Sequence, residues 1–88
     1  MTSFWTARFT GTFKRGYKRL RGEVQRRVET VIETLLSSDD PRKEGHMLHG
    51  PWEGCYSYEI GLKYRLIYRV EFKMKEIEFL AVGTHKIY

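Results

Sequence analysis

Three apolar stretches near the C-terminus are separated by very short turns, and this spacing constrains the fold more than any other feature. The stretches are residues 54–60, 62–72 and 76–83, and all are rich in β-branched and aromatic side chains. Strands joined by such short turns run antiparallel, because a parallel crossover needs a dozen or more residues. The sequence therefore predicts a three-stranded antiparallel meander.

A strand and two helices are predicted ahead of this meander. Residues 3–9 alternate between two faces and are rich in aromatic side chains, which favours a first strand. Apolar residues at helical spacing predict a short helix over 13–20 and a longer one over 24–36. Gly22 either separates these helices or lies within one long bent helix. The longer helix carries an apolar stripe of Val24, Val28, Val31, Ile32, Leu35 and Leu36.

The element order is therefore β-α-α-β-β-β, within one domain over residues 1–88. This order predicts an α+β fold, in which a helix pair covers one face of a mixed sheet and buries the apolar stripe. The other face is expected to be open. Residues 41–53 contain both prolines and show no period, so we expect a loop there. Met47, Leu48 and Trp52 are apolar enough to keep that loop ordered.

The strand over 62–72 presents basic side chains to the open face. Leu62, Tyr64, Leu66, Tyr68 and Val70 share the helix-covered side by alternation, and Lys63, Arg65, Ile67, Arg69 and Glu71 share the other. Arg65 lies in the middle of the strand between two tyrosines, where a long cation needs a partner or a function. We interpret it as a phosphate ligand. Lys63 and Arg69 are either further phosphate contacts or solvated surface charges.

The charge balance favours a polyanionic partner. The 16 basic and 11 acidic residues give a net charge of +5, which indicates nucleic acid ahead of membrane. Cys55 is the single cysteine, so no internal disulfide forms, and no Cys/His spacing resembles a zinc site. No signal peptide or membrane-spanning stretch is recognisable. We expect a cytoplasmic protein without a metal or a small-molecule cofactor.

The three histidines occur near the ends of predicted elements. His46 and His49 lie in the loop before the meander, and His85 follows the last strand. Histidine can accept or donate a proton near neutral pH, so a group of them at one edge of the open face would suit acid–base chemistry. Each is alternatively a plain surface residue.

Three segments resemble the RelE/ParE superfamily of toxins from type II toxin–antitoxin systems. They are the Leu-His-Gly of 48–50, the YRLIYRV of 64–70 and the AVGTHKIY of 81–88. The resemblance implies a RelE-like fold and places the chain in the RelE-like branch, whose members are endoribonucleases that cut mRNA on the ribosome. The partners it implies are mRNA, the ribosome and a cognate antitoxin. Two alternatives remain: a ParE-like inhibitor of DNA gyrase, and an inactive relative that only binds an antitoxin.

The resemblance also implies roles for individual residues. Arg65 would contact the scissile phosphate, His85 would be the general acid, and Tyr88 would stack on a base or assist proton transfer. His46, or alternatively Glu59, would be the general base. RelE itself has two lysines where this chain has Ser57 and Glu59, and this difference favours the histidine-using members.

Further RNA contacts are expected from basic residues outside this set. The helices carry seven cations, which would bind ribosomal RNA, receive an acidic antitoxin or simply be solvated. The candidate RNA-binding residues are His49, Lys63, Arg69, Lys18, Arg19 and Arg26; Lys14, Arg15, Arg21 and Arg27 complete the basic helix surface.

Overall fold

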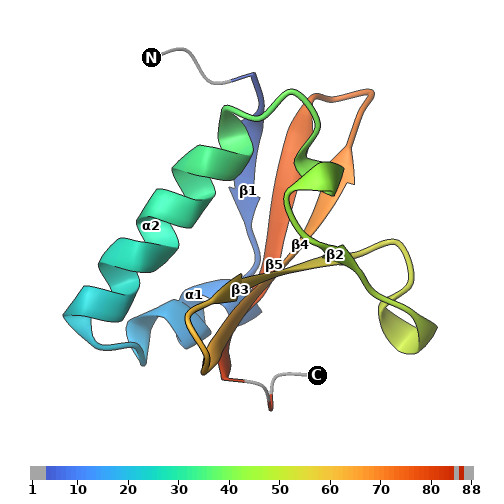
Figure 1. Ribbon diagram of the computed structural model, residues 1–88. Helices are drawn as coiled ribbons and strands as arrows, with labels where there is room; N and C mark the ends of the chain where they lie inside the picture. The colour runs from blue at the N-terminus through green and yellow to red at the C-terminus, as the bar shows by residue number, and fades with distance from the viewer. Residues whose placement is uncertain (1–3, 85, 87–88) are drawn as a thin grey trace.

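The computed structural model describes residues 4–84 and 86 and confirms the predicted α+β architecture (Figure 1). The elements are β1 (Thr6–Phe9), α1 (Gly11–Lys18), α2 (Gly22–Leu36), β2 (His46–Met47), β3 (Tyr56–Ile60), β4 (Tyr64–Glu71) and β5 (Glu76–Thr84), with 3-10 turns η1 (Pro41–Lys43) and η2 (Gly50–Trp52). Strands β1 and β5 are parallel neighbours, and all other pairs in the sheet order β1-β5-β4-β3-β2 are antiparallel.

The two helices are separate, so the alternative of one long bent helix is wrong. The Thr10 hydroxyl accepts a hydrogen bond from the Phe13 amide at 3.0 Å and begins α1. The chain leaves the helix after Lys18, and Arg21 has extended backbone angles before α2 starts. In Figure 1, α2 runs diagonally beside the sheet and α1 lies across its lower end.

The main core lies between α2 and the sheet, as the apolar stripe predicts. Tyr68 and Phe79 are the largest fully buried side chains, and the Trp5 indole nitrogen donates to the Ser38 carbonyl at 2.8 Å. This bond ties the N-terminal segment to the end of α2. The other buried members are Phe13, Val24, Val28, Val31, Leu35, Ile60, Leu66, Ile77 and Val82.

The alternation predicted for β4 is confirmed within the strand and fails before it. Leu66 and Tyr68 face the helix side, and Ile67 packs on the opposite face. However, β4 begins only at Tyr64, and the turn before it contains Leu62 and Lys63. Leu62 is 93% exposed. Gly61 causes this difference, because its φ of 65° turns the chain out of the sheet.

The face opposite α2 is covered at its centre, which corrects the prediction of an open face. Leu48 and Trp52 from the 37–55 connection pack over Cys55, Ile67 and Ala81. These side chains are apolar, so covering them removes hydrocarbon surface from water. Burial also raises the pKa of the Cys55 thiol, in keeping with its interpretation as a small buried side chain.

No helix in the described part of the chain has the length and apolar character needed to cross a membrane.

Candidate active site

A cavity of about 300 Å³ on this second face contains several of the predicted site residues. His46 comes from β2, Ser57 and Glu59 from β3, and Arg65 from β4, with Leu48 completing the described lining. The strand register explains their meeting. His46 lies opposite Ser57, and Glu59 lies opposite Arg65, so all four side chains emerge on one face.

The segment that carries His46 is fixed to the sheet just before the cavity. The buried Tyr68 hydroxyl donates to the Pro41 carbonyl at 2.6 Å. A Cβ on Gly45 would lie only 2.6 Å from that hydroxyl and 2.8 Å from the Ser57 carbonyl, so only glycine lets the chain pass here. Asp40 caps the preceding turn by accepting from the Arg42 amide at 3.1 Å. These contacts determine where β2 begins.

Arg65 is the central cation of the cavity. Its side chain is half-buried, with Glu59 opposite on one neighbouring strand and Gly83 opposite on the other. Because Gly83 has no side chain, nothing from that position of β5 covers the guanidinium. His46 is exposed and Ser57 is buried. A guanidinium, an imidazole and a carboxylate in one cavity can bind a phosphate and move a proton beside it.

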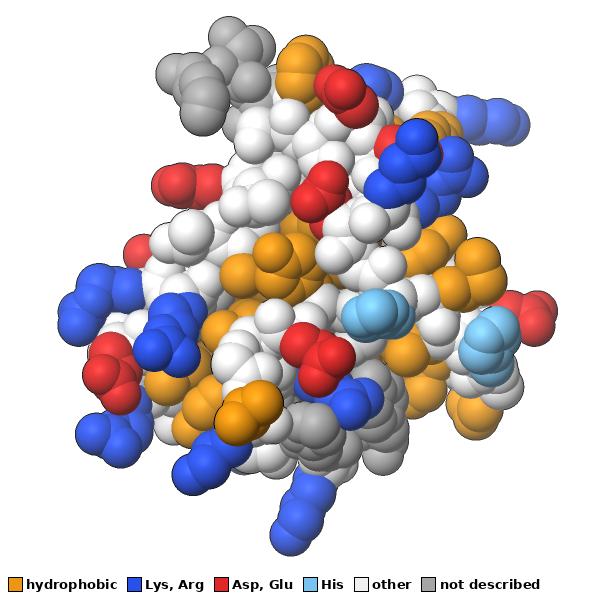
Figure 2. Space-filling view, viewed as in Figure 1, with side chains coloured by type: hydrophobic (Ala, Val, Ile, Leu, Met, Phe, Trp, Pro, Cys, Tyr) orange, Lys and Arg blue, Asp and Glu red, His pale blue; other side chains and the backbone are white. Residues whose placement is uncertain are grey.

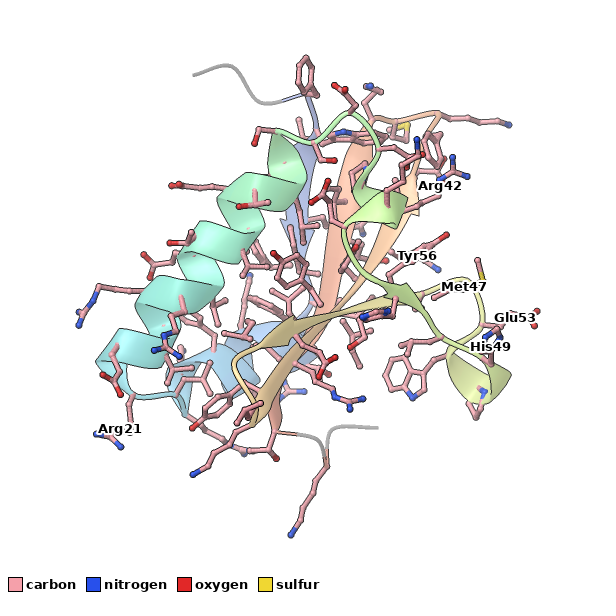
Figure 3. All side chains as sticks on the ribbon, viewed as in Figure 1. Arg21, Arg42, Met47, His49, Glu53 and Tyr56 are labelled. Atoms are coloured by element: carbon pink, nitrogen blue, oxygen red, sulfur yellow. The ribbon has the colours of Figure 1, made fainter. Side chains whose placement is uncertain are left out.

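Other predicted residues of the second face lie outside this cavity. Arg69 donates to Glu78 at 2.5 Å, and Arg8 approaches the same carboxylate at 4.0 Å. Lys63 is exposed in the turn before β4. His49 precedes η2 and is exposed there; Figure 3 shows it beside Glu53, in the loop at the right of the view. The two loop histidines therefore do not converge on one cavity.

The predicted helix cations are distributed over different surfaces. Lys18 lines an apolar groove with Phe9, Phe13 and Ile32, whereas Arg19 lines a separate cavity beside β5. Arg26 is exposed on α2. Figure 2 shows lysine and arginine side chains along the lower left of the molecule, where α1 and α2 meet. His85 and Tyr88 lie outside the described residues.

Leu48 and Ser57 are cavity residues to which the sequence analysis assigned no function. The sequence carries no periodic signal for either residue, because β2, the strand whose pairing puts His46 directly beside Ser57, is only two residues long. Among the described residues, no three histidine, cysteine or acidic side chains are close enough to hold a metal ion.

Comparisons with known proteins agree with this fold. The model of a family described as the bacterial toxin of type II toxin–antitoxin system, YafQ, matches residues 5–87. The RelBE2 toxin–antitoxin complex of Mycobacterium tuberculosis contains a similar chain with 27% identity and a TM-score of 0.81, covering 97% of this chain and 95% of that one. The intact E. coli RelBE complex gives 23% identity and a TM-score of 0.75, covering 93% and 98%.

The structure of YafQ from E. coli strain BL21(DE3) is also similar, with 19% identity and a TM-score of 0.75 over 92% of this chain and 93% of that one. No curated protein sequence matches. The predicted resemblance to the RelE-like superfamily is confirmed by the family model and by these folds. The chain belongs to the YafQ family of bacterial toxins of type II toxin–antitoxin systems.

Proposed function

We propose that this toxin is an endoribonuclease that cleaves mRNA on the ribosome without a metal ion and thereby stops translation. The observation that carries the proposal is the cavity in which half-buried Arg65 lies with Glu59 and His46. A cation surrounded by two groups able to accept a proton suits a phosphodiester whose neighbouring hydroxyl must be deprotonated.

The reaction would run through the RNA's own 2′-hydroxyl. His46, or alternatively Glu59, takes the 2′-hydroxyl proton, and the freed oxygen attacks the adjacent phosphorus. Arg65 binds the phosphate oxygens, on which negative charge increases during the attack. The bond to the 5′-oxygen of the next nucleotide breaks, leaving a 2′,3′-cyclic phosphate and a 5′-hydroxyl. The resemblance to RelE-like toxins assigns protonation of the leaving oxygen to His85, and base stacking to Tyr88.

The proposed partners are mRNA, ribosomal RNA and a cognate antitoxin, and the proposed location is the cytoplasm. The similar folds from M. tuberculosis and E. coli were determined as toxin–antitoxin complexes, which supports an antitoxin for this chain. The net charge of +5 supports RNA as the substrate. His49, Lys63, Arg69, Lys18 and Arg26 are proposed as outlying RNA contacts.

The test is cleavage of cellular mRNA after induced expression, mapped by primer extension. The wild-type protein is expected to produce cuts in phase with codons. His46→Ala and Arg65→Ala are each expected to slow cleavage by about 10²–10⁴-fold, the typical contribution of a positioned acid, base or charge ligand. Met47→Ala is the matched control, because Met47 follows His46 on β2, is exposed and does not line the cavity.

Two outcomes would contradict the proposal. DNA damage with translation intact would identify a gyrase inhibitor of the ParE kind. Growth unaffected by the wild-type protein, with antitoxin binding retained, would identify a relative without activity of its own.

A further inference from the structure

A second and larger cavity lies between α1 and β5, and the proposed chemistry does not use it. Its volume is about 490 Å³. The described lining combines two arginines, Arg15 and Arg19, with the ring of Trp52 and an apolar floor that includes Leu80 and Ala81. None of the described lining residues is acidic.

The helix that supplies the arginines is held firmly against the sheet. A Cβ on Gly16 would collide with the Val82 carbonyl oxygen, so α1 packs on β5 at glycine distance. The Thr10 hydroxyl, at the start of α1, donates to the Leu80 carbonyl at 2.7 Å. Arg15 and Arg19 are four residues apart and therefore share one side of the helix. The Arg15 guanidinium donates to the Thr12 hydroxyl at 3.3 Å, which orients it along the cavity wall.

This second cavity and the candidate active site are on the same face and share a wall. Leu48 lines the active-site cavity, Trp52 lines the second one, and both pack against the cluster of Cys55, Ile67 and Ala81. Ala81, Ile67 and Ser57 lie opposite one another on three adjacent strands. Because Ala81 and Ser57 are two strands apart, about 10 Å separates their positions in the sheet. One extended RNA strand can therefore occupy both cavities.

We propose that the second cavity binds a nucleotide of the RNA strand next to the cleaved bond, with its base stacked on Trp52 and its phosphate contacted by Arg15 and Arg19. This inference rests on the proposed ribonuclease function and adds a binding site to it. Bases have a flat π-face that stacks on aromatic rings regardless of sequence, and arginine supplies the charge for the backbone. An acidic peptide would use the arginines but would leave the indole without a matching flat group.

The experiment measures binding of a short, fluorescein-labelled 2′-O-methyl RNA by anisotropy. This probe lacks the attacking hydroxyl, so binding is observed without cleavage. Trp52→Leu is expected to weaken binding by about 5- to 150-fold, which corresponds to about 1–3 kcal/mol per stacked base. Trp52→Phe keeps an aromatic ring and is expected to retain most of the affinity. A melting curve of each variant verifies that the fold is intact.

Arg19→Gln provides a second measurement that does not depend on the packing of Trp52. Losing one phosphate contact is expected to reduce the slope of log Kd against log salt concentration by about one. Arg21→Gln is the matched control, because Arg21 is exposed at the start of α2 and points into solvent in Figure 3, outside both cavities.

The inference is overturned if Trp52→Leu and Arg19→Gln bind the probe as tightly as the wild type. It is also overturned if the wild type binds a polyglutamate peptide in preference to the RNA. Failure of the proposed function has a different signature. In that case no mRNA is cut, while the dependence of RNA binding on Trp52 remains.

Discussion

The hydrogen bond from Tyr68 to Pro41 allows the most direct test of how the His46 segment is held. Tyr68 is fully buried, and its hydroxyl donates to the Pro41 carbonyl at 2.6 Å across 27 residues. Burial raises the pKa of this phenol, so the proton that makes the bond stays in place at neutral pH. Tyr68→Phe removes the donor and keeps the ring, so the buried Pro41 carbonyl retains only its hydrogen bond from the Glu44 amide, at 3.2 Å.

Losing one intramolecular hydrogen bond while the acceptor keeps another donor costs about 0.5–1.5 kcal/mol. A loss of about 1 kcal/mol in the free energy of unfolding should lower Tm by about 4–8 °C in a domain of this size. Urea titration followed by circular dichroism, together with a melting curve, measures both quantities. Tyr56→Phe is the matched control. Its ring stacks on Tyr68 with centroids 5.7 Å apart, and its hydroxyl makes no hydrogen bond within the described part of the chain.

The reasoning is refuted if Tyr68→Phe changes the free energy of unfolding by less than about 0.5 kcal/mol, the range of an ordinary surface substitution. It is equally refuted if Tyr56→Phe is as costly as Tyr68→Phe. Either result would mean that the ring alone, through its packing, connects the loop to the sheet.

Three further substitutions test other parts of the fold. Gly16→Ala should lower the free energy of unfolding by about 1 kcal/mol or more, because the new Cβ meets the Val82 carbonyl. An increase in the free energy of unfolding would show that α1 is not in close contact with β5, because alanine in place of glycine otherwise stabilises a helix by about 1 kcal/mol. Leu35→Ala, at a fully buried site on α2, should cost about 2–5 kcal/mol in urea titration, whereas the exposed Leu62→Ala should be neutral. Asp40→Asn should destabilise the protein at neutral pH but not in acid. Hydrogen bonds from Arg42 lower the pKa of the Asp40 carboxyl, so its stabilising effect is present above about pH 4 and disappears as the pH falls through the folded-state pKa. Equal melting temperatures of Asp40→Asn and wild type near neutral pH would contradict this.

Regular periodicity was the part of the sequence that predicted structure well. The stripe on α2 and the alternation along β4 are sustained patterns, and they correctly identified the core side of both elements. The placement of Arg65 on the face opposite α2 followed from the same alternation. The error at Leu62 and Lys63 has a local cause, because a single glycine with positive φ ends the pattern two residues before the strand begins.

The composition of the site was less predictable, because it depends on the irregular connection between α2 and β3. A strand of two residues such as β2 is too short for any period, yet its pairing brings His46 beside Ser57. Met47, Leu48 and Trp52 are all predicted to keep the loop ordered, but Met47 is exposed. The partners of the other two, Cys55, Ile67 and Ala81, are distant or unpatterned in sequence. His49 is close to His46 in the chain and lies outside its cavity, because η2 begins immediately after it.

The parallel pairing of β1 with β5 has a consequence for biosynthesis. β1 is translated before β5, and the Thr10 hydroxyl donates to a carbonyl 70 residues further along the chain. Until β5 has been made, Phe13 lacks its ring contact with Phe79, and α1 has no strand on which to pack. Contacts this distant in sequence form late and slow the folding of the whole domain. A nascent chain therefore cannot complete this fold before β5 has been translated.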